Sequence, residues 1–394
     1  MIHRIIIKNL FGLYTYNLDS LFTKECSIRF ITGPNGYGKS TILVMLSKLM
    51  MCDFDYFKSL CFDKLQFYFD NRLIEIMKFT TSNSSIGEDI SKVKADLLKD
   101  VKISLINIDK KSEDAFYLLS LGNDQDMGKM EIEMFLRGES HYYIKDQRLF
   151  WSDAWATGNG LVSSSSNAVN HNADCLKDKL TKCREEIRSI LSFQSLSLKA
   201  DPISENEYED RKKRFIPTLN KMKSYGLASD GFVLPVYMPD SASLMRSFIE
   251  ICEKAEEQTR KFILQIDLFK EIVDRSEFAD KKCQISPEYG YRFVSCNQDR
   301  TLLDGSDLSS GEQHILIQTY ELIFNAPEGS LALIDEPEMS FHMIWQMDYL
   351  KNLNKIAKLK NLQCLVATHS PQIFDSMWNL TYDLYELTHP KQEE

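Results

Sequence analysis

The chain has 394 residues, of which 43% are hydrophobic and 26% charged, a composition typical of a globular protein that folds in water. Its formal net charge of −10 argues against broad, non-specific coating of nucleic acid, which requires dense lysine and arginine. No apolar run approaches the roughly 18 residues of a membrane-spanning helix, and the apolar run that opens the chain is too short for a signal-peptide core. We therefore expect a cytoplasmic protein of two or three domain-sized units with no membrane partner.

The nine cysteines fit that compartment. Their number is odd and no CxxC pair occurs, so the pattern predicts neither a disulfide framework nor a zinc site. We interpret them as buried or idle thiols.

The first 80 residues are predicted to be compact and rich in strands. Buried strands are expected at residues 2–7 and 26–32, and a helix at 40–51, where apolar residues recur at helical spacing. Residues 64–69 and 73–78 are strand-like runs on either side of Asp70-Asn71, which indicates a hairpin.

The composition changes over residues 81–230, which we interpret as an insertion. Residues 80–100 are polar and then amphipathic, and residues 157–174, with four consecutive serines, are typical of a mobile loop. Over residues 175–193 and 205–225, apolar residues alternate with charged ones at three- and four-residue spacing, so the second half of the insertion is predicted to be helical.

Strand character returns at Gly231–Met238, and Ala242–Val273 has the pattern of one long helix. Strands are then expected at Ser330–Ile334 and Gln363–Thr368, with a helix between them. Alternation of strand and helix predicts a parallel sheet and therefore an α/β fold.

A phosphate-binding loop is indicated between the strand ending at Thr32 and the helix beginning at Ser40. The sequence Gly33-Pro34-Asn35-Gly36-Tyr37-Gly38-Lys39-Ser40 fits GxxxxGK[ST] at every fixed position. Glycines let successive backbone N–H groups face a phosphate, and the helix N-terminus adds positive potential. The predicted nucleotide ligands are Gly33, Asn35, Gly36, Gly38, Lys39, Ser40 and Thr41; the lysine would neutralise the β- and γ-phosphates, the Ser40 hydroxyl would coordinate Mg²⁺, and Thr41 would contact the α-phosphate.

An acidic strand end supplies the other half of the predicted site. Four apolar residues, Leu331–Ile334, lead into Asp335 and Glu336, and such a strand delivers its carboxylates to the edge where open α/β sheets bind ligands. We expect Asp335 to hold the Mg²⁺ shell and Glu336 to act as general base on the attacking water. His369 follows the next strand, where it would position that water, although a histidine there can also be purely structural.

A further motif decides the class of ATPase. Leu308-Ser309-Ser310-Gly311-Glu312-Gln313 resembles the signature motif LSGGQ of ABC ATPases, and it lies in the family's order with the P-loop, the acidic strand, a D-loop region near Met339–His342 and the histidine. In that family the signature of one subunit binds the γ-phosphate held by the P-loop of the other. The resemblance therefore implies a head-to-tail dimer, or a higher homo-oligomer, around ATP and Mg²⁺. The residues acting across the dimer would be Ser309, Ser310, Gly311, Glu312 and Gln313.

The resemblance also implies a division of the chain. Residues 1–80 and 231–394 would form an ABC-type ATPase head, interrupted by the partly helical insertion 81–230. Such long insertions are similar to those of the SMC/RecF/OLD branch. The stretches IDEPEMSFHMIWQ and ATHSPQIF look most like the free-standing AAA ATPases of bacterial anti-phage systems, of the Septu and retron-associated type.

Some positions depart from this pattern or stay open. No Q-loop stands out: Gln66 lies inside a strand pattern, and residues 233–240 lack the expected Gln or Arg. Tyr14 is the candidate for stacking on adenine, with a core position as the alternative. Trp345 and Gln346 are expected to pack, and neither His141 nor His171 has the partners of a nuclease site.

Three functions are therefore weighed. The first is the sensor or regulator subunit of an anti-phage complex that controls a separate effector, such as a nuclease or toxin, with nucleic acid as a possible trigger. The second is a RecF-like repair ATPase that binds DNA directly, which a basic groove of DNA length would favour. The third is a transporter subunit, which the long insertion and the missing Q-loop disfavour.

Overall fold

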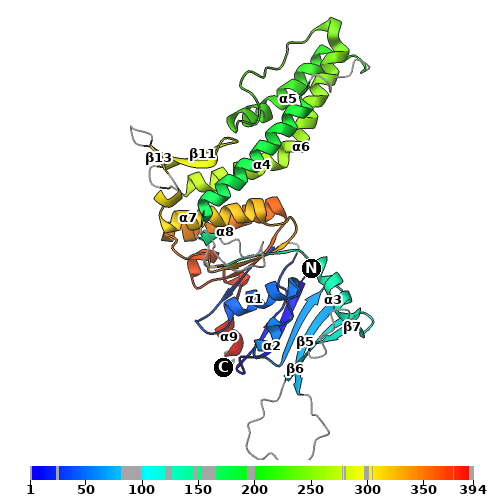
Figure 1. Cartoon of the computed structure of the whole chain (residues 1–394), viewed down its shortest axis with the longest axis vertical. Coiled ribbons are helices and arrows are strands. Elements are labelled where there is room, and N and C mark those ends of the chain that lie inside the picture. The colour runs from blue at the N-terminus through cyan, green and yellow to red at the C-terminus, as the bar shows by residue number, and fades with distance from the viewer. Residues whose placement is uncertain are drawn as a thin grey trace, which may run out of the picture. The chain divides into compact units, whose positions relative to one another are not determined.

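The computed structural model describes residues 2–389 apart from 24–25, 81–98, 120–126, 146–149, 152–165, 193–199, 277, 279–280, 297–300, 304 and 376 (Figure 1). The chain forms two compact units. Unit 1 comprises residues 1–146 and 325–394, and unit 2 comprises residues 147–324.

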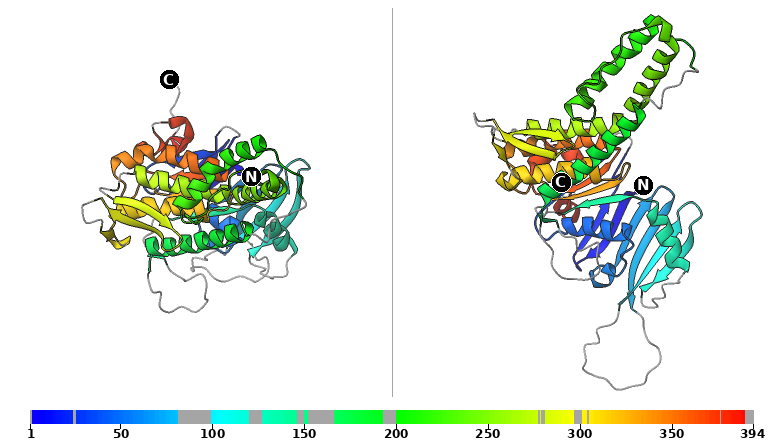
Figure 2. Two further views of the ribbon diagram at one scale, coloured as in Figure 1. Left: turned by 90° about the horizontal axis from the view of Figure 1, so that it is seen from above. Right: turned by 45° about the horizontal axis from the view of Figure 1, so that its top comes forward.

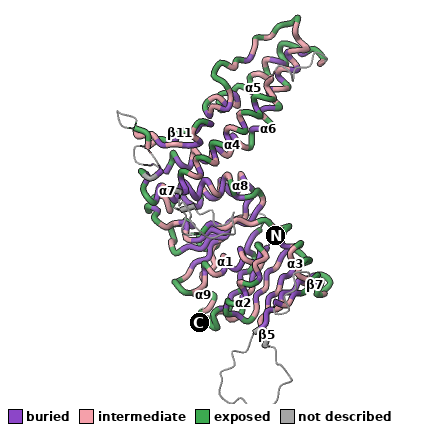
Figure 3. The backbone as a smooth tube through the Cα atoms, viewed as in Figure 1, coloured by how far each residue is buried: buried purple, intermediate pink, exposed green. Residues whose placement is uncertain are grey.

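A five-stranded parallel sheet lies at the centre of unit 1. Its strand order is β16-β3-β15-β14-β8, and each neighbouring pair is parallel. β14 is buried at every position, as expected for a strand covered on both faces (Figure 3). The strands are β3 (Ile28–Thr32), β8 (His141–Ile144), β14 (Leu331–Asp335), β15 (Gln363–Ala367) and β16 (Thr381–Asp383). The predicted α/β fold and the parallel pairing of the two C-terminal strands are confirmed.

A six-stranded antiparallel sheet of order β2-β1-β4-β5-β6-β7 forms the second layer of unit 1 (Figure 2). β4 and β5 pair on either side of Asp70-Asn71, which confirms the predicted hairpin. The strands are β1 (Ile2–Leu10), β2 (Tyr14–Leu18), β4 (Lys64–Phe69), β5 (Arg72–Thr80), β6 (Lys99–Asn107) and β7 (Ser112–Leu118).

Helix α1 (Lys39–Met50) joins the two sheets into one core. It packs against β8, β14 and β15, and its buried side chains Ile42, Leu43 and Leu46 belong to the same hydrophobic cluster as residues of β1 and β4–β6. The remaining helices of unit 1 are α2 (Tyr56–Ser59), α3 (Met127–Arg137), α8 (Met343–Lys360) and α9 (Leu384–Thr388), with 3₁₀ turns at Pro371–Phe374 and Trp378–Leu380.

Unit 2 is mainly helical. Its helices are α4 (Ala168–Ile190), α5 (Glu205–Ser224), α6 (Ala242–Arg275) and α7 (Ser310–Tyr320), and a π-helical turn, Glu321–Asn325, follows α7. α5 lies along α6, held by ion pairs of Arg211 with Glu253 and Lys221 with Asp267 (Figure 1). A small antiparallel sheet contains β11 (Lys281–Ser286), β12 (Gly290–Ser295) and β13 (Leu302–Leu303), and β9 (Phe150–Trp151) pairs with β10 (Ser166–Asn167). Short 3₁₀ turns span Pro239–Ser241 and Gly305–Asp307.

The division into units follows different boundaries from those of the predicted segments. β6, β7, α3 and β8 lie within the range assigned to the insertion, yet they belong to unit 1. β6 pairs with β5 along its whole length and β8 pairs with β14, so long-range strand pairing decides where they belong. Residues 231–324, assigned to the head, lie in unit 2.

The strand predicted at Gly231–Met238 is wrong, because this segment has no regular structure. Pro235 cannot donate to a ladder, and its carbonyl accepts hydrogen bonds from the Tyr208 hydroxyl (3.0 Å) and Lys212 Nζ (3.1 Å) instead. The loop predicted for residues 157–174 is wrong at its end, where residues 166–167 form β10 and residues 168–174 form the first turns of α4. Its earlier part, and most of the amphipathic stretch at 80–100, lie outside the described residues.

All nine cysteines are free thiols, and burial raises the pKa of several of them, Cys252 and Cys364 to about 12.

Within the described ranges, no three His, Cys, Asp or Glu side chains form a metal-binding group. No described helix combines the length and apolar character needed to cross a membrane.

Candidate nucleotide site

The loop Gly33–Ser40 connects β3 to α1 in unit 1, as the motif requires. Gly38 is the N-cap of α1 with φ of 90°, and Gly36 has φ of 85°, both in the left-handed region that favours glycine. A Cβ at Gly38 would lie 2.9 Å from Leu10 Cδ2, so any larger residue there would also require the Leu10 side chain to shift. Asn35 and Gly36 are exposed at the tip of the loop, and Gly33 at its base has φ of 135°.

Lys39 is held inside this loop. Its Nζ donates to the carbonyl oxygens of Gly33 (2.8 Å) and Pro34 (3.1 Å), and the residue is only 5% exposed. Burial lowers the pKa of Lys39, whereas the nearby carboxylates of Glu336, Asp335, Glu338 and Asp383 oppose that shift. The ammonium group is thus aligned with the inner face of the loop, where it can meet a phosphate anion.

Ser40 and Asp335 meet across 295 positions of sequence. The Ser40 hydroxyl donates to Asp335 Oδ1 at 3.0 Å, and the Tyr143 hydroxyl of β8 lies 3.4 Å from Asp335 Oδ2. Asp335 is 5% exposed and ends β14. A hydroxyl and a carboxylate oxygen placed side by side are donors of the kind that Mg²⁺ prefers, so this pair fits the metal. Thr41 follows on the first turn of α1 and is half-buried.

Glu336 and His369 face each other at the carboxyl ends of β14 and β15. The Glu336 backbone turns here with φ of 43°, and its N–H donates to the Ala367 carbonyl at 2.9 Å. His369 Nε2 lies 3.5 Å from Glu336 Oε1, and both side chains are about one third exposed, 35% and 36% respectively. A carboxylate and an imidazole this close together can both contact one water molecule.

Two functional neighbours were not predicted from sequence. Tyr143 contacts Asp335, and Glu338 accepts hydrogen bonds from the backbone on either side of His369. Glu338 carried a usable signal, since it follows Glu336 across a single proline. Tyr143 carried none, because only the parallel pairing of β8 with β14 brings it to this edge.

Tyr14 lies in a cluster of aromatic rings around the loop. Its ring stacks on Tyr37 of the P-loop, with centroids 4.9 Å apart, and Tyr37 also lies 5.9 Å from Tyr385 of α9. The buried Tyr16 donates its hydroxyl to the Tyr37 carbonyl at 2.7 Å, and burial raises its pKa. One face of Tyr14 is therefore occupied by the loop itself, and adenine stacking on Tyr14 stays a prediction.

The signature sequence forms the N-terminus of α7 in unit 2. Ser309 is the N-cap: its hydroxyl accepts from the Glu312 N–H at 3.3 Å, and the Glu312 carboxylate accepts from the Ser309 N–H at 2.7 Å, which is a complete capping box. Ser309 and Ser310 are exposed, and Gly311 is buried. The Gln313 side chain donates to the carbonyls of Gly305 and Leu308, both at 2.9 Å.

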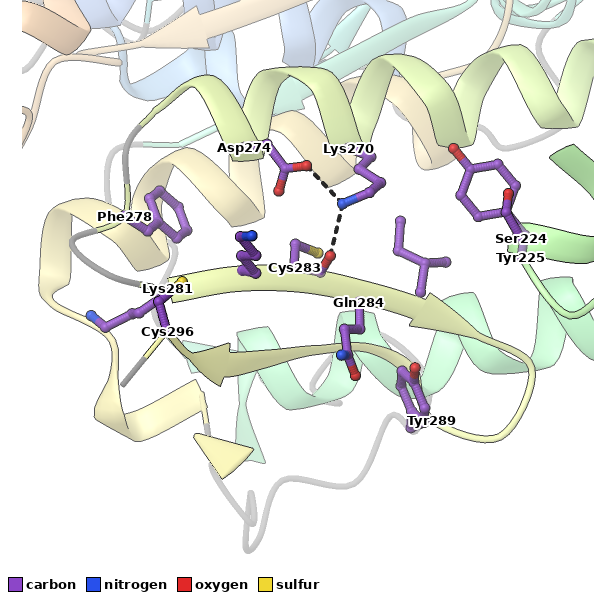
Figure 4. A pocket seen from close by; sticks show the side chains of 12 residues that line it. Ser224, Tyr225, Lys270, Asp274, Phe278, Lys281, Cys283, Gln284, Tyr289 and Cys296 are labelled. Carbon is purple, nitrogen blue, oxygen red and sulfur yellow. Dashed lines mark hydrogen bonds and ion pairs between the residues drawn. The ribbon is translucent and has the colours of Figure 1, made fainter. Parts of the chain in front are cut away.

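Glu312 is turned away from solvent and paired with Lys281 of β11. Lys281 Nζ lies 2.9 and 2.8 Å from the two carboxylate oxygens, and Glu312 is 4% exposed. Lys281 lines one end of an open cleft of about 1120 Å³ between α6 and the β11–β12 hairpin (Figure 4). Farther along the cleft, Lys270 donates to Asp274 (2.7 Å) and to the Cys283 carbonyl (2.8 Å). Within the signature, Glu312 and Gln313 thus hold the helix end in place, while the two serines face outward.

A glycine-rich loop on a helix N-terminus, with a buried lysine and a Ser–Asp pair at the edge of a parallel sheet, defines a P-loop ATPase of α/β fold. The chain matches the family model described as "AAA ATPase domain" over residues 1–374, and it belongs to that family. Membership indicates ATP binding and ATPase activity.

Among solved structures, the chain is similar to two SMC head domains. The first is titled "Crystal structure of the SmcHead bound to the C-winged helix domain of ScpA". Its sequence is 12% identical, the match covers 95% of this chain and 91% of that chain, and the TM-score is 0.37. The second is an Smc head domain "with an extended coiled coil bound to the C-terminal domain of ScpA derived from Pyrococcus furiosus". Its sequence is 13% identical, the match covers 94% of this chain and 90% of that chain, and the TM-score is 0.34. A comparison with curated proteins found no match.

Proposed function

We propose that two copies of this chain enclose ATP head to tail and hydrolyse it to ADP and phosphate at sites shared between them. The observation that carries this proposal is the pairing of Ser40 with Asp335 beside Glu336 and His369 at one sheet edge, which supports a metal site next to a general base. The outward-facing Ser309 and Ser310 support the second half of the proposal, because they offer hydroxyl and N–H donors to a phosphate of another copy.

Each residue has a role that follows from its position. The loop amides and Lys39 would bind the β- and γ-phosphates, and Ser40 and Asp335 would hold Mg²⁺. The bound metal would neutralise charge on the phosphate oxygens. Glu336 would take a proton from the attacking water, and His369 would orient that water. The water oxygen would bond to the γ-phosphorus while the bond between the γ-phosphorus and the β–γ bridging oxygen breaks.

A mixing experiment tests the shared site. Lys39→Ala destroys the P-loop of its own chain, and Ser309→Arg destroys only the signature offered to the other chain. Each variant alone is expected to be inactive. In a mixed head-to-tail dimer one of the two sites is intact, so random exchange of equal amounts should restore about one quarter of wild-type ATPase activity.

The matched control is a mixture of Lys39→Ala with Glu336→Gln. Both changes disable the catalytic half that belongs to the same chain, so neither site of the mixed dimer is whole and no activity should return. Recovery in this control, or none in the first mixture although both variants dimerise, would contradict the shared site.

We further propose that the ATPase is the sensor or regulator subunit of an anti-phage complex that controls a separate effector, such as a nuclease or toxin. The support is the similarity of its acidic strand and histidine segments to the free-standing ATPases of such systems. In a strain carrying the gene with its natural neighbours, Lys39→Ala should abolish protection in plaque assays. Equal plating on wild-type and variant strains would refute this role, and tight, salt-sensitive DNA binding by the isolated ATPase would favour a repair function instead.

A further inference from the structure

Glu338 lies in the turn that follows the acidic strand. Its own carbonyl accepts from the Phe341 N–H at 2.8 Å, and the Met339 N–H donates to the Glu336 carbonyl at 3.2 Å, so the segment after Pro337 folds back on itself. This turn directs the Glu338 side chain toward the end of β15, where its carboxylate accepts hydrogen bonds from Thr368 and His369.

One oxygen of the Glu338 carboxylate accepts hydrogen bonds from three consecutive residues. Oε1 accepts from the Thr368 hydroxyl at 2.6 Å, from the His369 N–H at 2.7 Å and from the Ser370 N–H at 3.2 Å. Thr368 is fully buried, and Glu338 Oε2 is a buried atom with no hydrogen-bond partner among the described residues. Hydrogen bonds to a charged acceptor are shorter and stronger than neutral ones, so this carboxylate is the main polar contact of the loop that carries His369.

The loop has a second attachment on the other side. The Ser370 hydroxyl lies 2.5 Å from Gln346 Oε1 on α8 and 2.7 Å from Gln372 Oε1. The His369 ring is one third exposed, and among the described residues its polar contact is with Glu336, whose Oε1 lies 3.5 Å from His369 Nε2. The backbone contacts of Glu338 therefore fix the position from which the His369 side chain extends toward Glu336.

We propose that Glu338 is a positioning residue for ATP hydrolysis: it orders the backbone at Thr368–Ser370 so that His369 and Glu336 meet at the same water. This inference rests on the proposed roles of His369 and Glu336. In this proposal Glu338 acts on hydrolysis through His369, by way of its hydrogen bonds to Thr368, His369 and Ser370.

A double-mutant cycle on the full chain separates this role from a general structural one. Glu338→Ala should lower kcat about 10- to 100-fold while the KM for ATP changes little, because a small misplacement of a catalytic group is costly. Glu338→Gln keeps an acceptor oxygen and should retain most of the activity. In a His369→Ala background, Glu338→Ala should lower kcat no further, since the residue it positions is gone.

Independent losses that multiply in the double variant would overturn the inference, as would unchanged kcat in Glu338→Ala. The matched control is Glu131→Ala, which removes an exposed carboxylate from α3 in the same unit and should leave kcat unchanged. If Glu338→Ala does not fold, Thr368→Val, which removes one donor from the same oxygen, takes its place in the cycle. A wild-type chain without ATPase activity would refute the proposed function, whereas an active wild type with a multiplicative cycle would refute only this inference.

Discussion

Lys39 is the residue on which the nucleotide site depends most directly. It is buried, its Nζ donates to two carbonyl oxygens of its own loop, and four carboxylates lie near enough to influence its pKa. A buried ammonium that bonds to neutral carbonyls gains more from a phosphate, because the anion supplies both charge and hydrogen-bond acceptors. The loop is thus shaped around the cation.

Replacing Lys39 with alanine should reduce ATP affinity at least about 30-fold, since it removes a charge-assisted contact from a buried site. Isothermal titration with ATP and Mg²⁺ measures the change. Lys48→Ala on the same helix is the control: Lys48 pairs with Asp53 at the surface, 2.7 Å away, and its loss should leave ATP affinity unaltered. Equal affinity in wild type and Lys39→Ala would mean that the loop does not bind phosphate.

At the scale of elements, the N-terminus of α7 is held by a pair that joins it to β11. Lys281 and Glu312 have side-chain exposures of 19% and 5%, and Glu312 also completes the capping box with Ser309. Removing one member of a nearly buried pair leaves the other charge without compensation. The geometry of the signature serines therefore depends on a strand that is not part of the motif.

Lys281→Met is expected to destabilise this part of unit 2 by about 2 kcal/mol, because the Glu312 carboxylate loses its counter-charge. Hydrogen exchange measured by mass spectrometry should show faster exchange in the first turns of α7, with ATP affinity at the P-loop of unit 1 maintained. Adding Glu312→Gln should restore most of the protection of α7 against exchange. Glutamine can keep the capping box, and it removes the carboxylate charge that has lost its partner Lys281.

Lys282→Met is the matched control for that experiment, because Lys282 is the next residue on β11 and is exposed. It should leave exchange in α7 unchanged. Equal effects of the two methionine substitutions would show that the ion pair does not hold the signature.

At the scale of the whole molecule, the proposed catalytic residues and the signature-like sequence belong to different compact units. The P-loop, Asp335, Glu336 and His369 lie in unit 1, and Ser309–Gln313 lie in unit 2. Unit 1 is itself assembled from both ends of the chain, since β3 pairs with β15 and β16. The order of motifs along the chain thus reflects a head whose two halves are separated by unit 2.

Much of the site was predictable from sequence because its parts are short and local. A P-loop needs a strand, a glycine-rich turn and a helix start within a dozen or so residues, and an apolar strand ending in Asp335-Glu336 brings its acids to one edge of the sheet. The helical spacing over 175–193 and 205–225 likewise matches α4 and α5.

What only the tertiary structure decided depends on partners that are distant in sequence. β6, β7 and β8 join unit 1 through strand pairing. The segment 231–238 is irregular because the Pro235 carbonyl accepts a hydrogen bond from Tyr208 of α5. Glu312 forms an ion pair with Lys281. The same holds for Glu338, whose three donors come from a different strand end. Local sequence determined which chemical groups this protein carries at its nucleotide site. Long-range packing determined which of them face the phosphate and which hold the others in place, because burial and hydrogen-bond partners exist only once the chain has folded.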